Sequence, residues 1–238
     1  MMKKLALTVV LLGMALLTLT GCFGKSSRRF IEGKAAELSK VYPTENLEDL
    51  FEKFPGGFSI WSEDLYDYKE GEGYLFQSVK LRGDGETKKI IGTIVSEKIT
   101  SNGTKAPTEE KIYEGGVVYK DGMIQLMDPQ ANVMIRNPKL LLQEFTINKD
   151  ILSRLKMGGK GYSYETGSAD IDYTITDPIV NNYMRVEQDK ELKMIFYIMS
   201  GTVENKAYSY TFEIKDGHNS HSELFSGYKK QEFKLYND

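Results

Sequence analysis

The sequence predicts an α+β protein in which an antiparallel sheet carries its helices on one face. Strand-like runs follow one another with short turns between them, and a helical segment near residue 140 separates two groups of strands. The resulting order is helix, strands, helix, strands, without the strict alternation typical of a doubly wound parallel sheet. A length of 238 residues suits one domain with a substantial core.

Two helical segments are expected before the first strand. Phe30–Lys40 has helical character, and a second helix is expected after Tyr42-Pro43, with Thr44 as its N-cap. In this second segment, apolar residues recur at the spacing of one helix face, at Leu47, Leu50, Phe51 and Phe54. Pro55-Gly56-Gly57 is expected to end the helix.

The first group of strands reads as an antiparallel meander. Its expected members are Phe58–Tyr66, Tyr74–Arg82, Lys89–Ile99, Lys111–Lys120 and Met123–Met127. Asp121-Gly122 separates the last two, and a two-residue Asp-Gly connection between apolar runs strongly indicates a hairpin. Short connections of this kind join antiparallel neighbours.

The second half returns to helical spacing and then to strands. A helical region is expected over Pro138–Met157, with Asn137-Pro138 at its start, a break at Thr146–Asn148 and Gly158-Gly159 at its end. Pro178–Gln188 is ambiguous and is compatible with a helix. The expected strands are Ser168–Thr176, Leu192–Thr202, Ala207–Lys215 and Glu223–Leu235. A division of the domain into two halves near Gln130–Pro138 stays open.

The N-terminus has the layout of a secretory signal peptide. Lys3 and Lys4 precede an apolar run from Leu5 to Leu19. Fifteen residues rise only about 22 Å as a helix, whereas a bilayer core is about 30 Å thick. We therefore expect residues 1–21 to be a signal peptide rather than a permanent membrane span.

The only cysteine lies where a lipoprotein signal peptide places its lipid. Leu19-Thr20-Gly21-Cys22 fits the lipobox pattern of an aliphatic residue, two small residues and a cysteine. A diacylglyceryl group would alkylate the Cys22 thiol, and the small Thr20 and Gly21 would let a protease cut between Gly21 and Cys22. The alternative is an ordinary signal peptide, or an anchor helix, with an incidental cysteine.

This reading sets the domain organisation and the location. Residues 22–29 would be the lipidated N-terminus and its tether, and residues 30–238 would form a single extracytoplasmic domain on the cell membrane. Two acyl chains, such as palmitate-type chains, suffice for stable anchoring. The predicted membrane partner is thus lipid, bound through acylated Cys22, and the acylated thiol could not serve as a nucleophile.

Composition excludes several other classes of function. The formal charge of -3 provides no basic field for nucleic acid. A single cysteine cannot form an internal disulfide and cannot supply a thiolate-rich zinc site. We expect no cofactor and no metal, and a protein partner would be one that the sequence does not identify.

Three short patterns are candidate sites. His218 and His221, with Asp216 and Glu223 nearby, could ligate a metal, although a solvated polar turn after Gly217 is the favoured interpretation. Asp170 and Asp172 share a strand face, so they could perform acid–base chemistry or form the wet face of a half-exposed strand. Gly158-Gly159-Lys160-Gly161 lacks the Ser or Thr of a phosphate-binding loop and indicates a helix end. No catalytic residue is predicted, and we expect the protein not to be an enzyme.

The stretch from Val41 to Lys53, VYPTENLEDLFEK, resembles the staphylococcal tandem lipoprotein family, also called the conserved staphylococcal antigen family. The strand around Trp61-Ser62-Glu63 and the DYTIT strand at Asp172 follow in the family's order. The resemblance covers most of the mature chain, but its specific part is the first third. It implies a surface-exposed, membrane-anchored antigen with roles in immune stimulation and host-cell contact, and it brings no catalytic motif.

Three functions follow as hypotheses. The first is a non-enzymatic, lipid-anchored surface protein that contacts host or envelope macromolecules. The second is a module that binds a lipid or another apolar ligand in a cavity lined by Tyr, Phe and Met. The third is a cell-surface hydrolase that would use acidic groups such as Asp170 and Asp172.

Overall fold

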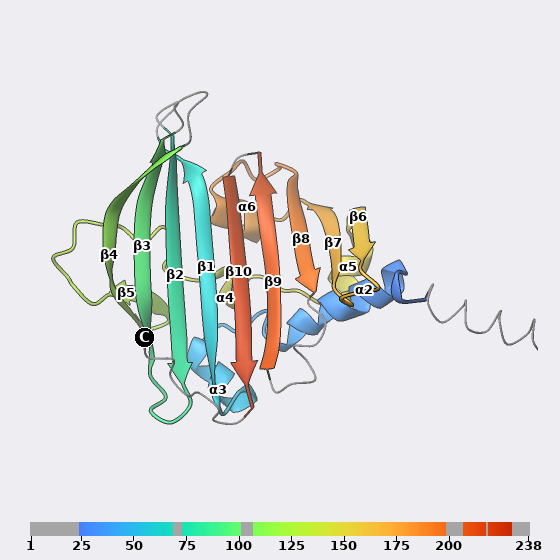
Figure 1. The fold of residues 1–238 in the computed structure, drawn as a ribbon, viewed down its shortest axis with the longest axis horizontal. Coiled ribbons are helices and arrows are strands. Elements are labelled where there is room, and N and C mark those ends of the chain that lie inside the picture. Colours follow the sequence, from blue (N-terminus) through green and yellow to red (C-terminus); the bar gives the residue numbers. More distant parts are fainter. Residues whose placement is uncertain (1–23, 69–72, 101–106, 199–206, 218, 230–238) are drawn as a thin grey trace, which may run out of the picture.

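The structure, a computed structural model, describes residues 24–68, 73–100, 107–198, 207–217 and 219–229. Within these residues ten strands form one sheet in the order β5-β4-β3-β2-β1-β10-β9-β8-β7-β6 (Figure 1). Every neighbouring pair is antiparallel. The predicted α+β class with an antiparallel sheet is therefore confirmed.

Each half of the chain contributes one five-strand meander. The first half supplies β1 (Gly57–Asp67), β2 (Tyr74–Asp84), β3 (Ile90–Thr100), β4 (Thr108–Lys120) and β5 (Met123–Leu126). The second supplies β6 (Lys156–Tyr162), β7 (Ala169–Ile175), β8 (Leu192–Ile198), β9 (Ala207–Asp216) and β10 (Asn219–Tyr228). Strand β1 pairs with β10 from Phe58↔Gly227 to Leu65↔Ser220, so the sheet runs without interruption through both halves.

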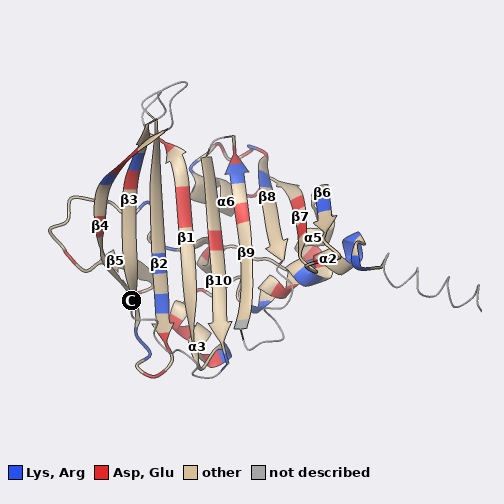
Figure 2. Ribbon diagram, viewed as in Figure 1, with Lys and Arg blue, Asp and Glu red and all other residues tan. Residues whose placement is uncertain are grey.

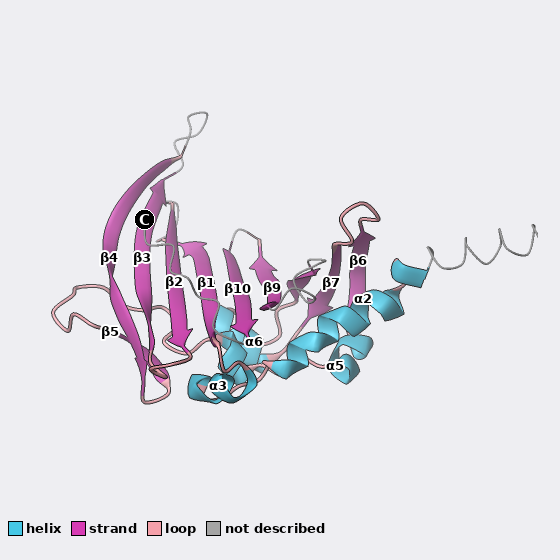
Figure 3. Cartoon of the chain, turned by 60° about the horizontal axis from the view of Figure 1, so that its bottom comes forward, coloured by secondary structure: helices cyan, strands magenta, loops and turns pink. Residues whose placement is uncertain are grey.

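The helices are short and lie along one side of the sheet (Figure 3). They are α2 (Arg28–Ala35), the 3-10 helices η1 (Ala36–Lys40) and η2 (Leu47–Asp49), α3 (Leu50–Lys53), α4 (Leu141–Glu144), α5 (Lys149–Arg154) and α6 (Pro178–Met184). Among the residues that the structure describes, no helix combines the length and the apolarity that a bilayer span requires. Residues 146–148 break the predicted long helix into α4 and α5, as expected from the sequence.

Two predicted helix starts are wrong. The Thr44 hydroxyl donates a hydrogen bond to the Val41 carbonyl at 2.7 Å, so it does not cap a helix, and η2 begins only at Leu47. Asn137-Pro138 does not open α4 either, because the Pro138 carbonyl accepts a 2.7 Å hydrogen bond from the Ile124 amide of β5. In both places a partner outside the local segment decides the backbone conformation.

The predicted helix end at Gly158-Gly159 is also wrong, because residues 156–162 form the edge strand β6. The strand pairs with β7 and carries a β-bulge between Met157 and Gly159. A Cβ at Gly158 would overlap the Asp172 carboxylate, and one at Gly161 would overlap the Asp170 carboxylate. The glycines therefore leave room for two acidic side chains of the neighbouring strand. In the sequence alone, the same glycines look like the end of a helix and a turn.

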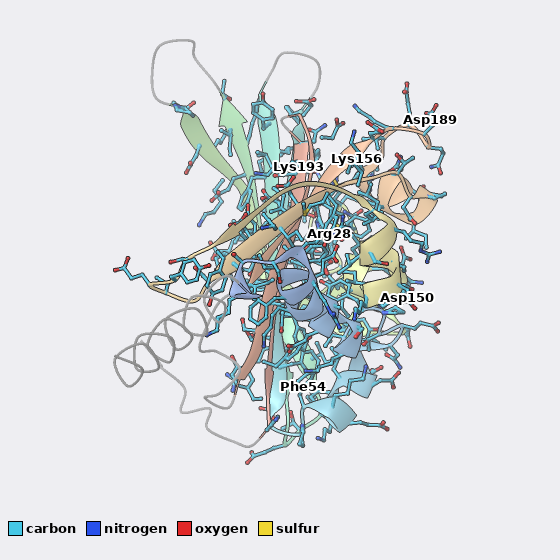
Figure 4. The ribbon with its side chains drawn as sticks, turned by 90° about the vertical axis from the view of Figure 1, so that its right-hand side faces the viewer. Arg28, Phe54, Asp150, Lys156, Asp189 and Lys193 are labelled. Carbon is cyan, nitrogen blue, oxygen red and sulfur yellow. The ribbon has the colours of Figure 1, made fainter. Side chains whose placement is uncertain are left out.

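The core lies between the sheet and the helices and is rich in aromatic rings. Phe58 of β1 contacts Phe51 of α3 at a ring separation of 5.0 Å, and Phe225 of β10 contacts Phe54 at 5.2 Å. Glycines on the strands that flank β1 make room for these rings, since a Cβ at Gly227 would overlap the Phe54 ring. Figure 4 shows Phe54 in this layer, below the end of the sheet that α2 covers.

Candidate functional site

A row of buried polar side chains crosses the helix-covered face of the sheet. His221 of β10 pairs with Asp64 of β1, which pairs with Gln77 of β2, which pairs with Ser96 of β3. All four are buried, and His221 has no exposed surface. A polar row at this depth must have its hydrogen bonds satisfied within the protein, since unpaired polar groups are costly to bury.

His221 lies between two carboxylates. Its Nδ1 is 2.9 Å from Asp64 Oδ1, and its Nε2 is 3.2 Å from Glu223 Oε1. A protonated imidazolium donates from both nitrogens, so it is the form that satisfies both carboxylates. Burial alone lowers the pKa of His221, but the Asp64 and Glu223 carboxylates outweigh burial and raise the pKa to about 9.

The Glu223 carboxylate accepts hydrogen bonds from several donors. Besides His221, its carboxylate accepts hydrogen bonds from the Tyr42 hydroxyl at 2.6 Å, the Leu141 amide at 2.7 Å and the Leu142 amide at 3.0 Å. Burial and the Glu223 charge raise the pKa of Tyr42 well above its usual value, so this hydroxyl remains a donor. The carboxylate thus binds the first amides of α4, where the helix dipole favours a negative charge.

Arg136 provides a positive charge near the Asp64 carboxylate. Its guanidinium lies 3.7 Å from the centroid of the Tyr66 ring and donates to the Met184 carbonyl at 3.2 Å. Burial lowers the pKa of Arg136, and the attraction of Asp64 opposes that change. Arginine remains charged in proteins, so His221 and Arg136 supply two positive charges against the two negative charges of Asp64 and Glu223.

The polar row fastens the connection between β5 and α4 to the sheet. Residues 127–140 form neither helix nor strand; Leu140 is buried, and the other residues are half-buried or exposed. Gln77 accepts from the Arg136 amide at 2.8 Å and donates to the Met134 carbonyl at 3.1 Å, while the Asn137 amide group lies 3.4 Å from Asp64. The sheet thus supplies hydrogen-bond partners for the backbone of this loop where it lies against the strands.

A second polar contact continues the same attachment. The Tyr119 hydroxyl of β4 accepts hydrogen bonds from the Leu47 amide and the Gln143 side chain, each at 3.1 Å. Gln143 also accepts from the Leu140 amide at 3.0 Å. These contacts tie η2 and α4 to β4.

The structure corrects the sequence-based placement of the histidines. His221 lies within β10 and is buried, whereas a solvated turn was expected. Its partner in that prediction, His218, lies outside the described residues, as do Leu19, Thr20, Gly21 and Cys22. Within the described part of the chain, no group of three or more His, Cys, Asp or Glu side chains is arranged to hold a metal ion.

The aspartate pair lies on the opposite face of the sheet from His221. Asp170 is exposed, and the Asp172 carboxylate is 3.6 Å from the Lys193 ammonium group. The side chains that alternate with them, Ile171 and Tyr173, are fully buried in the core. The pair therefore lies on the solvent-exposed face of a half-exposed strand, in agreement with one of its two sequence-based interpretations.

The sequence did not predict the buried cluster around His221 because polar and apolar residues do not alternate clearly along β10. His221, Glu223 and Phe225 face inward, while Leu224 on the other face is also apolar. Because both faces of β10 mix polar and apolar side chains, the sequence pattern does not show which face is buried. The usable signal was the spacing of two between His221, Glu223 and Phe225, which places a histidine and a carboxylate beside a core aromatic residue.

Comparisons with solved structures include a distant likeness to a bacterial protein. No protein family matches the sequence, and no curated protein matches it. Among solved structures, the fold is similar to that of LprF from Mycobacterium bovis, with a TM-score of 0.35 and 10% identity. The alignment covers 82% of this chain and 94% of LprF. A likeness at this level carries no conclusion about function.

Protonation of His221 is expected to stabilise the fold. Because the folded-state pKa of about 9 exceeds the ordinary 6.5, the stabilisation is complete below about pH 6.5 and is lost as the pH rises through 9. The full effect is roughly 3 kcal/mol, at about 1.4 kcal/mol per pKa unit. The free energy of unfolding, measured by denaturant titration, should fall over this range in the wild type and not in His221→Gln.

The control uses the fact that the chain has only two histidines. In His218→Gln the single remaining imidazole can be followed by NMR, and it should stay protonated at pH 8. An imidazole that titrates near its ordinary pKa, or equal pH slopes for wild type and His221→Gln, would contradict the assignment of His221 as a buried imidazolium.

Proposed function

We propose that this chain is a bacterial lipoprotein held on the extracytoplasmic face of the cell membrane by a lipid on Cys22, and that its domain is a non-enzymatic interaction protein. One observation carries the proposal. A basic start, an apolar run and Leu19-Thr20-Gly21-Cys22 follow in the order that lipidation requires.

The short tether keeps the domain close to the membrane. Six peptide steps separate Cys22 from Arg28, the first residue of α2. An extended chain spans at most about 3.6 Å per residue, so this distance is no more than about 22 Å. A lipid on Cys22 would thus hold α2 near the head groups, and the sheet would extend away from the membrane.

The outer face of the sheet, opposite the helices, is the proposed contact surface. It presents Trp61 of β1, which is 39% exposed, and Tyr197 of β8, also 39% exposed. The Trp61 indole donates to the Ser78 hydroxyl at 2.8 Å, and the Lys80 ammonium group lies 4.1 Å from the ring centroid. A positioned, half-exposed Trp is a residue type that often dominates binding interfaces.

The stretch that carries the family resemblance contributes to the core rather than to the outer face. The stretch Val41–Lys53 that carries the resemblance forms η2 and α3, and its apolar residues Leu47 and Leu50 are fully buried. We therefore assign this stretch a role in the fold, and we place recognition on the outer face. Membership in the tandem lipoprotein family is part of the proposal.

An apolar ligand is the less favoured alternative. The inward-facing rings contact one another in the layer between sheet and helices, as in Tyr173 with Phe196 on neighbouring strands at 6.1 Å and Tyr42 with Phe212 at 5.2 Å. Rings in such contact contribute to packing within the core. The arrangement favours an interaction protein over a carrier that reserves this space for a ligand.

Replacement of Cys22 tests the anchor. In Cys22→Ala the thiol that receives the diacylglyceryl group is absent, so the chain should leave the membrane fraction or accumulate as the uncleaved precursor. Immunoblots of fractionated cells measure both outcomes. Ser26→Ala is the matched control and should fractionate as wild type. Normal processing and anchoring of Cys22→Ala would contradict lipidation.

Replacement of Trp61 tests the contact surface. Wild type should bind saturably to isolated cell-wall fragments or to intact host cells, and Trp61→Ala should bind roughly 30-fold more weakly, as for a hot-spot side chain of about 2 kcal/mol. Ile112→Ala, which removes a side chain that is 49% exposed on β4, is the control and should bind as wild type. Absence of saturable wild-type binding to both probes would contradict an interaction role.

A further inference from the structure

Two segments far apart in the sequence form one surface at the end of the sheet where the described chain begins. They are residues 24–36, which include α2, and residues 149–162, which include α5 and β6; we call this the anchor-end surface. The Arg28 guanidinium donates to the Ser153 carbonyl at 3.3 Å, and the Lys160 ammonium group donates to the Ser26 carbonyl at 2.5 Å. Figure 4 looks onto this end, with Arg28 on α2 and Lys156 above it.

The anchor-end surface is strongly basic in an acidic protein. Residues 24–36 contain four Lys or Arg and one Glu, and residues 149–162 contain four Lys or Arg and one Asp, which gives +6 against -3 for the whole chain. Figure 2 shows basic positions on α2 and on β6. Six of the eight basic side chains are exposed: Lys25, Arg29, Lys149, Arg154, Lys156 and Lys160.

The acids near this surface do not cancel its charge. Glu32 is buried, 2.7 Å from the Arg28 guanidinium, and it accepts from the Tyr173 hydroxyl at 3.1 Å. The neighbouring acids outside the two segments are Glu37, Glu165, Asp170 and Asp172. Glu37 is paired with Lys34 and Lys40, and Asp172 is paired with Lys193. Counting these four acids together with Lys40 and Lys193 changes +6 to +4, so the surface remains attractive to anions.

Aromatic rings extend from the same surface. Tyr164, just beyond β6, is 57% exposed and lies 5.0 Å from the Tyr162 ring, which in turn lies 6.2 Å from the Phe30 ring of α2. Tyrosine combines an apolar ring with a polar hydroxyl and is enriched at the level of membrane head groups. Basic residues with an exposed Tyr indicate an interfacial surface more specifically than charge alone.

We propose that the anchor-end surface lies against the bilayer and binds anionic lipid head groups. This inference rests on the proposed lipidation of Cys22, because the tether brings α2 within reach of the membrane. A lipid chain combined with a basic patch is a common pair of membrane signals, and Lys and Arg side chains near an anionic surface are attracted to it. The protein would stand with β6 toward the membrane and the β4–β5 edge away from it, which leaves Trp61 accessible.

Fluorescence quenching in vesicles tests this orientation. Alkylation would block the only native thiol, so a cysteine introduced in the lipidated full chain becomes the single labelling site. Gly33→Cys on α2 is suitable because Gly33 is exposed and a Cβ there meets no atom within 4 Å. Lys120→Cys, at the exposed end of β4, is the matched position at the opposite edge of the sheet.

In vesicles of phosphatidylglycerol and phosphatidylcholine, head-group spin labels should quench the fluorophore at residue 33 and spare the one at residue 120. Quenching at residue 33 should weaken in vesicles of phosphatidylcholine alone and in high salt, because exposed charges are screened. It should also weaken when Lys25, Arg29 and Lys156 are all replaced by Gln. The control variant, with Lys53, Lys89 and Lys139 replaced by Gln, should behave as wild type.

The outcomes separate this inference from the proposed function. Equal quenching at residues 33 and 120, or quenching at residue 33 that ignores lipid charge and the three substitutions, would overturn the orientation while leaving the anchor in place. A purified chain whose Cys22 carries no lipid would overturn the proposed function, and the orientation would fall with it.

Discussion

The buried Glu223 carboxylate is the interaction on which the architecture depends. It joins β10 to Tyr42 and to the first amides of α4, and it shares His221 with Asp64 of β1. A helix of four residues such as α4 has no stability of its own, since helix nucleation is unfavourable and few of its amides have partners. The helix persists because a carboxylate in the sheet receives those amides. The same row of side chains holds residues 127–140 against the sheet, so the two meanders share one core.

The sequence predicted the features that local chemistry decides. The Asp121-Gly122 hairpin is an example, because φ angles of 54° and 77° suit these two residues and few others. The antiparallel meander of β1 to β5, the break at residues 146–148 and the α+β class also followed from turns and periodicity. Predictions failed where tertiary partners decide the outcome: at Gly158 and Gly161, which accommodate Asp172 and Asp170, and at His221, which is buried between two carboxylates. No local pattern encodes such partners.

The distribution of charge connects the fold with the proposed location. The central cluster is balanced, with His221 and Arg136 against Asp64 and Glu223, so it contributes order without a net field. The unbalanced positive charge lies instead on α2, α5 and β6, at the end of the sheet next to the tether (Figure 2). The outer face, with Trp61 near its centre, points neither to the helices nor to that end. An anchored, oriented domain with one accessible face is the arrangement that these placements support together.

The intact mass of the protein extracted from membranes tests the central claim most directly. The account predicts a chain that begins at Cys22 and carries the added mass of a diacylglyceryl group on its N-terminal peptide. A membrane-associated chain that still begins at Met1, or one whose Cys22 is a free thiol, would contradict it.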